Sequence, residues 1–600
     1  MSIDNGPIPR WIHWLVLLVA LGELGAITLL LSGRLHGPQR NLVPQALVGG
    51  AMALCVLAAY VIRFHPGQFR SAPARLGIVV LTIFALGLCG LYFLRYRPIL
   101  TLPYDLGGWS ESFFMTDIIK WRTGTPLYTI PEDSNSGAYT PGAPALSYFL
   151  ARLLGRADSI RTYRLLLQMY LAFAALFAGA AAWNLLRIAD PERFARVSRW
   201  WLPFFVFTLF LVATNEETNA FNIYLHNDPL SVLVSMIAFW VLTQFACSQN
   251  TRWLAAMAVL PALGFLVKQY LAVFAAVYVV YLWLDGKSSL RRVVTFGAAT
   301  FAILGGTVAA GFFIWGDSYR YWVLELMSSH IVSFSKLNER FADAGWFVLL
   351  GLFGGLVLLR GERFSRLIPL WTGWLVMTLG GIYTSGVTFS PTHLGPASMV
   401  GASFALVALV TLWPSSEARD ASFAQQWLQV VAGMLAVLAI FAGMGFTRAP
   451  RLTVEPDLHR YVREIEHEFE GLPADRVLLD MGEWVYLREN VAMKDRMAVL
   501  NTHRKPHYGL LDRIHRQEYA RILIHLQPDG EISYELDGNR GIARALMENY
   551  REVRRIPGIQ GMQRWRYYSM AMSDIVVYEA VPRSSNGPSG PAAAPQGGKR

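Results

Sequence analysis

The sequence has few charged residues and very little cysteine. Only 16% of its 600 residues are charged, whereas 54% are hydrophobic. A soluble domain usually carries about 25% charged residues, so this deficit, together with a mean hydropathy of +0.34, excludes an ordinary soluble protein. The three cysteines, Cys55, Cys89 and Cys247, lie in apolar runs without zinc or disulfide spacing, and we expect them to be small buried residues.

The sequence also lacks a nucleotide-binding motif. It contains no Walker-type loop and no glycine-rich dinucleotide turn, so we do not expect a cytosolic nucleotide as an activated donor. The net charge of +11 does not indicate nucleic-acid binding, because lysine and arginine lie mainly in short loops and in the C-terminal part. We therefore expect no nucleic-acid partner.

Apolar runs long enough to cross a bilayer recur over the first three quarters of the chain. A helix needs about 20 apolar residues to cross a hydrocarbon core. The first run has no small-residue cleavage site after it and is interpreted as a retained span. The fold class expected is an α-helical polytopic membrane protein, with a membrane domain over residues 1–447. Its predicted spans, about 13 helices, are residues 11–31, 44–62, 76–95, 163–187, 199–215, 228–247, 253–267, 270–284, 293–315, 345–360, 367–386, 394–413 and 425–446.

Loop charges predict how these helices are oriented. Arginine and lysine gather in four loops, around residues 63–75, 187–199, 287–292 and 360–366. All four loops lie on one side if the N-terminus is cytoplasmic, as the positive-inside rule requires. The pattern needs a helix break at Lys268-Gln269. With an odd number of spans, the long loop 96–162 and the C-terminal part then face outside.

The C-terminal part has a different composition. Residues 448–581 are charged and mixed in pattern, and they are numerous enough for one soluble domain. Residues 457–469 have helical spacing, while short apolar runs predict strands at 476–480, 519–526 and 574–580. We expect an extracytoplasmic α/β domain. Residues 582–600, rich in proline, glycine, serine and alanine, are expected to be disordered.

Two carboxylates lie where the outer loops meet predicted spans. Asp105 is flanked by Tyr104 and Trp109, just before a stretch whose spacing suits an amphipathic surface helix. Reduced solvation there would suit a general base, although Asp105 could instead cap the helix or be solvated. Asp228 could likewise cap its helix, with Pro229 at the first helical position. Together the two could orient a sugar hydroxyl or share a divalent cation, the one cofactor considered.

Basic residues near the same side could bind a phosphate. Lys268 interrupts an apolar run, and an ionisable group in a membrane segment suggests a function. It could also extend its ammonium to the interface. His393, at another helix entrance, could contact a phosphate or make only local hydrogen bonds. A further basic set in residues 316–344 comprises Arg320, His330, Lys336 and Arg340.

Taken in order, these segments resemble the GT-C glycosyltransferases that use lipid-linked sugars. The branch they resemble contains bacterial relatives of the protein mannosyltransferases and of the aminoarabinose transferase of lipid A. The first loop of that branch has an acidic residue, a surface helix, a Gly-x-Pro-Leu-Tyr-like turn and an aromatic, proline-rich stretch. This pattern is matched here by Asp105, Glu111, Gly124 to Tyr128 and Tyr139 to Tyr148. Two further motifs are matched by His226-Asn-Asp-Pro-Leu230 and Gly264-Phe-Leu-Val-Lys268.

The chain departs from that pattern in two places. The mannosyltransferase branch has an adjacent Asp-Glu pair, whereas Asp105 and Glu111 are six positions apart, so either could be the base. Three predicted spans precede the loop, where relatives commonly have one.

The resemblance implies a hexosyl- or pentosyltransferase of the bacterial inner membrane. The donor would be a polyprenyl-phosphate sugar that enters from the membrane lipids, and the acceptor an extracytoplasmic glycan, lipid or protein, with inversion at the sugar carbon. The implied catalytic residues are Asp105, Glu111 and Asp228. Those implied for the lipid phosphate are Lys268, His393, Arg320, Lys336 and Arg340. Those implied for sugar or acceptor contact are Tyr104, Trp109, Tyr128, Tyr139 and His226.

Two other functions fit a polytopic membrane protein. A transporter or lipid flippase would carry ionisable groups within repeated broken helices, but the sequence shows one such break and no internal repeat. A polysaccharide polymerase or ligase also has many spans and a large outer loop, although it would not require the C-terminal domain.

Overall fold

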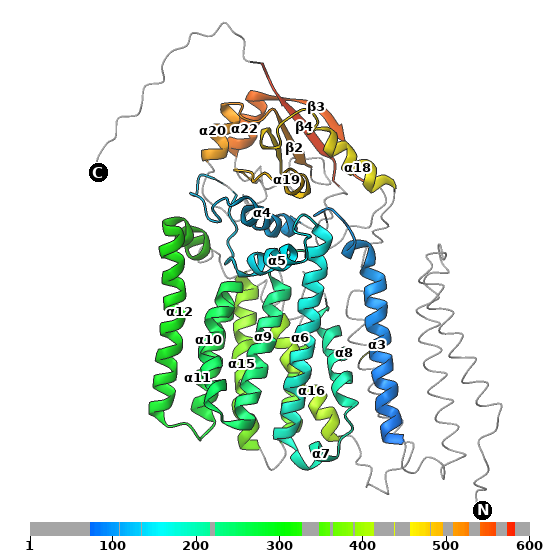
Figure 1. Cartoon of the computed structure of the whole chain (residues 1–600), viewed down its shortest axis with the longest axis vertical. Helices are drawn as coiled ribbons and strands as arrows, with labels where there is room; N and C mark the ends of the chain where they lie inside the picture. Colours follow the sequence, from blue (N-terminus) through cyan, green and yellow to red (C-terminus); the bar gives the residue numbers. More distant parts are fainter. Residues whose placement is uncertain are drawn as a thin grey trace, which may run out of the picture.

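Long helices form the body of the molecule, and a small mixed domain lies beyond one end of them (Figure 1). The structure is a computed structural model. It describes residues 73–106, 109–133, 135–215, 223–326, 347–359, 364–387, 391–412, 437, 456–480, 482–495, 508–526, 540–559 and 573–582. The predicted spans 11–31 and 44–62, and all of 425–446 but one residue, lie outside this description, as does the predicted tail beyond residue 582.

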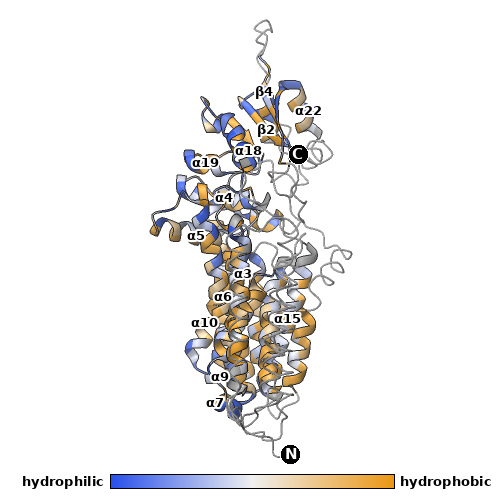
Figure 2. Cartoon of the chain, turned by 90° about the vertical axis from the view of Figure 1, so that its right-hand side faces the viewer, coloured by the Kyte–Doolittle hydropathy of each residue, from blue (hydrophilic) through white to orange (hydrophobic). Residues whose placement is uncertain are grey.

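Every predicted span between residues 76 and 413 contains a helix. The long ones are α3 (Pro73–Leu100), α6 (Ile160–Ala189), α9 (Asp228–Ser248), α12 (Leu290–Tyr319), α15 (Phe364–Val387) and α16 (Gly395–Leu412). The shorter apolar ones are α8 (Trp201–Ala213), α10 (Thr251–Val267), α11 (Val273–Leu284) and the helix Phe347–Leu358. Six segments of the described residues are long and apolar enough to cross a membrane. The chain is therefore a multi-pass membrane protein, and Figure 2 colours most of the residues in these helices as hydrophobic.

Small residues let α6 pack at the centre of this bundle. Ala174, Ala178 and Ala182 are fully buried, and a Cβ on Gly179 would lie 2.7 Å from the side chain of Val206 on α8. Because lipid tails are as apolar as these side chains, close backbone approach stabilises such helix pairs. By contrast, α12 exposes large apolar side chains such as Phe313, as expected of a lipid-facing helix.

The predicted break at Lys268-Gln269 is confirmed. α10 ends at Val267, Lys268 is extended (φ −161°, ψ 129°), and the short helix η2 (Gln269–Ala272) leads into α11. Because the backbone of Lys268 is extended, its side chain does not belong to the apolar face of either neighbouring helix. This places the lysine at a helix end and not within a continuous span.

The first loop contains two helices that lie across the end of the bundle (Figure 1). α4 (Trp109–Thr123) covers the predicted surface helix, and α5 (Gly142–Leu153) follows it. α4 lies between the bundle and the C-terminal domain, and most side chains from Glu111 to Lys120 are buried. The predicted helix is therefore present, and the C-terminal domain covers it. The remaining short helices outside the C-terminal domain are α7 (Pro191–Arg196), the π-helix η3 (Arg320–Glu325) and η4 (Pro391–Leu394).

The C-terminal domain is built on a four-stranded sheet of order β1-β2-β4-β3. β1 runs parallel to β2 with Val477 opposite Arg521, while β4 is antiparallel to both β2 and β3. The strands are β1 (Val477–Leu479), β2 (Arg521–His525), β3 (Tyr550–Ile556) and β4 (Ile575–Ala580). The helices are α18 (Pro456–His467), η5 (Ala474–Arg476), α19 (Trp484–Glu489), α20 (Tyr508–His515) and α22 (Arg540–Asn549). β3 was not predicted, because only its end residues are buried.

Candidate active site

A buried group of polar residues surrounds the break after α10. The Lys268 ammonium donates a hydrogen bond to Asp228 Oδ1, and His226 Nδ1 lies 2.8 Å from Asp228 Oδ2. Lys268 Nζ also lies 5.3 Å and 5.6 Å from the ring centroids of Tyr139 and Tyr270. Pairing and aromatic faces compensate the burial of this charge. These residues and His393 are called the Lys268 cluster below.

The end of the first loop is fixed against the end of α10. Thr140 Oγ1 donates to the carbonyl of Phe265 (2.7 Å), and Gln269 Nε2 donates to the carbonyl of Ala138 (2.7 Å). A Cβ on Gly142 would lie 2.5 Å from the carbonyl oxygen of Leu266, so only glycine allows this approach. These contacts place Tyr139 beside Lys268.

The two histidines of the Lys268 cluster are both buried, and burial lowers the pKa of each. The rings of His393 and Tyr270 lie 4.5 Å apart, and burial, assisted by the charge of Lys268, lowers the pKa of His393 to about 3. Burial also lowers the pKa of His226, although Asp228 opposes that shift. Among the described residues, His393 Nδ1 has no hydrogen-bond partner.

Glu111 forms a buried ion pair that sequence reasoning missed. Arg164 Nη2 donates to both carboxylate oxygens of Glu111, at 2.8 Å and 2.7 Å, and both side chains are inaccessible to solvent. The backbone N–H of Leu225 donates to Glu111 Oε1 (3.1 Å), so this pair also positions the residue before His226. An arginine within a predicted span was the signal that could have identified it.

Asp105 contacts the C-terminal domain. Its fully buried carboxylate accepts hydrogen bonds from the backbone N–H of Glu483 (2.7 Å), that of Trp484 (3.1 Å) and Ser112 Oγ (3.2 Å). Burial raises the pKa of Asp105, while these bonds oppose the shift. Tyr104 packs edge-to-face on Trp484. Asp105 and Asp228, which were expected to act together, thus belong to different hydrogen-bond networks.

A small pocket lies next to the Lys268 cluster. It is lined by Phe113, Phe114, Asp117, Gly137, Tyr139, His226 and Asn227. Asp117 supplies a carboxylate to this lining from α4, on the same helical face as Phe113 and Phe114. The spacing could have indicated it, but sequence reasoning did not single it out. Within the described part of the chain, no group of three or more His, Cys, Asp or Glu residues is placed to hold a metal ion.

Tyr128 and Arg320, which the structure describes, are not among the residues that line the pocket. Tyr128 donates to the carbonyl of Tyr139 (2.7 Å) and packs against Trp315 and Tyr319, so it supports the loop. Arg320 forms an exposed ion pair with Glu325. Trp109 is the first residue of α4. Lys336 and Arg340 lie outside the described residues.

The bundle, its first loop and the buried polar cluster at the helix ends define a membrane protein with a site close to one bilayer surface. Residues 205–315 match the family model described as dolichyl-phosphate-mannose-protein mannosyltransferase. That segment contains both Asp228 and Lys268. Over this segment the match confirms the resemblance to the GT-C glycosyltransferases of lipid-linked sugars that was expected from the sequence.

The chain is also similar in overall shape to solved structures. One is the archaeal oligosaccharyltransferase AglB from Archaeoglobus fulgidus in complex with an inhibitory peptide and a dolichol-phosphate. The match includes 82% of this chain and 80% of AglB, with a TM-score of 0.49 and 11% sequence identity. Another is the apo form of the Archaeoglobus fulgidus oligosaccharyltransferase. Here the match includes 81% of this chain and 80% of that protein, with a TM-score of 0.48 and 10% sequence identity. No curated protein matches the chain.

Proposed function

We propose that the protein transfers a sugar from a polyprenyl-phosphate donor to an extracytoplasmic acceptor, by direct displacement with inversion at the sugar carbon. The observation that carries the proposal is the composition of the pocket: it is lined by a carboxylate, Asp117, and by Tyr139 and His226 of the Lys268 cluster. The mannosyltransferases of the matching family model are named for an isoprenoid-phosphate sugar, and this supports a donor of the same chemical class.

Lys268 is suited to bind the phosphate of the donor. The leaving polyprenyl phosphate gains negative charge as the glycosidic bond breaks, and a fixed ammonium in a buried setting stabilises such a charge. Asp228 holds the ammonium in place. His393, neutral and with Nδ1 unoccupied among the described residues, could accept or donate a further hydrogen bond there.

Asp117 is our choice for the general base. A base must reach the acceptor hydroxyl or amine, and Asp117 is the carboxylate among the residues that line the pocket. The oxygens of Asp105 and Glu111 are bound by backbone N–H groups, by Ser112 and by Arg164. These two remain candidates from sequence, but their contacts favour structural roles.

We place the protein in the bacterial inner membrane, with the N-terminus in the cytoplasm. The pocket and the C-terminal domain would then face the periplasm, where an acceptor glycan, lipid or protein is found, while the donor would enter from the membrane lipids. The basic loops expected in the cytoplasm support this orientation.

The test compares cell-envelope glycans by mass spectrometry in cells that carry the wild-type protein, no protein, or single variants. We expect Asp117→Asn to reduce the sugar modification by about 100-fold or more, since general base catalysis contributes about that much. Lys268→Met should reduce it as well. Abundance in the membrane should stay unchanged for Asp117→Asn.

The matched control is Asp457→Asn, which alters an exposed carboxylate on α18 and should leave the glycans as in the wild type. Full modification in the Asp117→Asn strain would remove Asp117 from the chemistry. Unchanged glycans in cells without the protein would contradict transfer to an envelope acceptor altogether.

A further inference from the structure

The C-terminal domain holds the first loop at its start. The N–H groups of Gly482, Glu483 and Trp484 donate in succession to Ser112 Oγ (3.0 Å) and to the two oxygens of Asp105 (2.7 Å and 3.1 Å). Both Asp105 and Ser112 are buried by this contact. Each side supplies the partner that the other needs, because a buried carboxylate or N–H group without a hydrogen bond is costly. We call this contact the first anchor.

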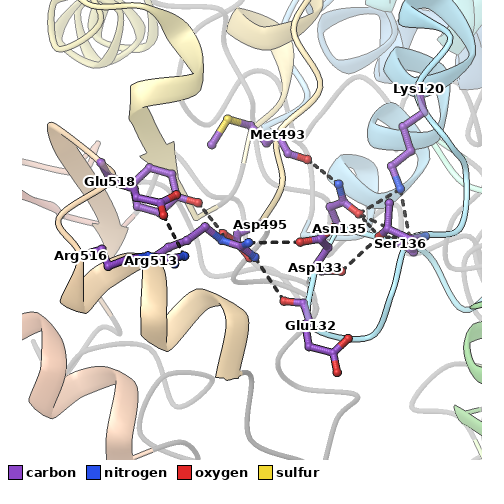
Figure 3. A network of polar contacts seen from close by, with 12 residues as sticks. Lys120, Glu132, Asp133, Asn135, Ser136, Met493, Asp495, Arg513, Arg516 and Glu518 are labelled. Atoms are coloured by element: carbon purple, nitrogen blue, oxygen red, sulfur yellow. Dashed lines mark hydrogen bonds and ion pairs between the residues drawn. The ribbon is translucent and has the colours of Figure 1, made fainter. Parts of the chain in front are cut away.

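A second anchor holds the loop between α4 and α5. Arg513 of α20 donates from Nη2 to the carbonyl of Glu132 (3.2 Å) and lies 3.2 Å from Asp133 Oδ1, while Asp495 fixes the guanidinium with contacts of 2.5 Å and 2.6 Å. Asn135 Nδ2 donates to the carbonyl of Met493 (2.6 Å). Figure 3 shows these side chains between the two parts of the molecule.

The loop is connected internally between the two anchors. Lys120 of α4 is fully buried and donates to the carbonyl of Leu127 (2.7 Å), Asn135 Oδ1 (3.1 Å) and Ser136 Oγ (3.1 Å) (Figure 3). Arg122, at the end of α4, donates to the carbonyl of Leu487 in the C-terminal domain (2.6 Å). A displacement at either anchor would therefore be transmitted along the loop.

Each part of the loop that lines the pocket follows one of these two anchors in sequence. Phe113, Phe114 and Asp117 follow the first anchor directly, and Gly137 and Tyr139 follow the second anchor by a few residues. Each part of the loop that lines the pocket is thus next to a contact with the C-terminal domain. The C-terminal domain therefore contacts the loop on which the proposed base, Asp117, lies.

We infer that residues 456–582 act as a clamp on the first loop, with Asp105 and Arg513 as positioning residues that hold the pocket wall in its working geometry. The role in catalysis rests on the proposed function, whereas the clamp itself does not. Asp105 on this account acts through Asp117 and exchanges no proton with the acceptor.

Gly509 offers a variant that separates the two parts without removing any side chain. A Cβ at this position of α20 would lie 2.1 Å from the carbonyl oxygen of Glu132 and 3.1 Å from Arg513 Nη2. Alanine favours a helix more than glycine does, so Gly509→Ala should not weaken α20 itself. Its effect must come from the second anchor. The control is Gly305→Ala on α12, where a Cβ meets nothing within 4 Å.

The experiment measures hydrogen exchange by mass spectrometry on the full-length protein in detergent. Gly509→Ala and Asp105→Asn should each speed exchange about tenfold or more in peptides that cover residues 112–139 and 482–484. Asp105→Asn weakens the first anchor and Gly509→Ala the second, and both anchors join the first loop to the C-terminal domain. Gly305→Ala should match the wild type. Wild-type exchange over residues 112–139 in both variants would overturn the clamp.

Activity in native membranes forms the second arm. Both variants should lower sugar transfer while the residual activity of Asp105→Asn keeps the pH profile of the wild type, because the base is still present. Loss of the acidic limb of that profile would instead make Asp105 a catalytic group. Faster exchange with full activity would show that the domain does not position the pocket. If the wild type shows no transfer at all, the proposed function fails and the exchange data alone decide the clamp.

Discussion

The partners of a carboxylate decide its role in this molecule. Glu111 is bound by Arg164, Asp105 by backbone N–H groups, Asp228 by Lys268, and Asp117 lines a pocket. Chain position near a span end made Asp105 and Asp228 look equivalent from sequence. A buried pair such as Glu111 and Arg164 depends on good geometry, because breaking it leaves an uncompensated charge. The four acidic groups therefore have different surroundings, and we expect different effects when each is substituted.

A buried neutral histidine makes folding stability depend on pH in a definite direction. The pKa of His393 falls from 6.5 to about 3 in the folded protein because of burial, with the charge of Lys268 adding to it and that of Asp228 opposing it. Above pH 6.5 neither folded nor unfolded chain binds the proton. Below it only the unfolded chain does, so stability is lost as the pH falls towards 3, by about 1.4 kcal/mol per pH unit.

We predict that His393→Gln reduces the fall in melting temperature between pH 7.5 and pH 5. Thermal unfolding in detergent, followed by tryptophan fluorescence, measures this. His226 shifts in the same direction, so part of the pH dependence should remain. His467→Gln, at an exposed position on α18, is the control and should behave as the wild type. An unaltered pH dependence in His393→Gln would show that His393 is already protonated or exposed.

At the scale of elements, the sequence predicted what apolar pattern and charge determine. The break at Lys268 followed from the requirement that basic loops share one side, and strands β1, β2 and β4 followed from short apolar runs. β3 was missed because its interior residues are exposed. The burial of α4 could not be predicted, since the C-terminal residues that cover it are hundreds of positions away and pair with it through backbone groups.

The sequence predicted the residues of the candidate site only in part, because the site also depends on contacts between distant parts of the chain. Asp228, His226, Lys268, Tyr139 and His393 were all named from sequence, and the structure brings them together. Their grouping depends on tertiary contacts between the first loop and the end of α10, which no local pattern encodes. Asp117 was overlooked, although it shares a helical face with Phe113 and Phe114, which also line the pocket.

The contact between α5 and α10 gives a prediction at this scale. Gly142→Ala would place a Cβ 2.5 Å from the carbonyl oxygen of Leu266, and backbone cannot yield as a flexible side chain can. We expect a loss of about 1–3 kcal/mol of stability, as for other overpacked sites, and reduced sugar transfer, because Tyr139 would move away from Lys268. Melting temperature and transfer in membranes measure the two effects.

The control for this variant is Gly90→Ala on α3, where a Cβ would have no neighbour within 4 Å. It should retain wild-type stability and activity. Equal behaviour of the two alanine variants would mean that α5 and α10 are not held at the distance the structure shows.

At the scale of the whole molecule, two ends of the bundle differ in chemistry. The C-terminal domain, the first loop and the Lys268 cluster gather at one end, and the turn between α11 and α12, which carries Lys287, lies at the other (Figure 1). The proposed sugar transfer needs the acceptor to reach only one side of the membrane. The positive-inside rule assigns the Lys287 end to the cytoplasm.

The orientation can be tested with a thiol reagent that does not cross membranes, in a background where Cys55, Cys89 and Cys247 are replaced by serine. Arg544→Cys, on the exposed face of α22, should be labelled in cells whose outer membrane alone is permeable. Lys287→Cys, also exposed, should be labelled only after the inner membrane is opened. The reverse order would invert the orientation and place the pocket on the cytoplasmic side. Because the two positions lie at opposite ends of one described bundle, equal labelling of both in intact cells would contradict a membrane-spanning arrangement itself.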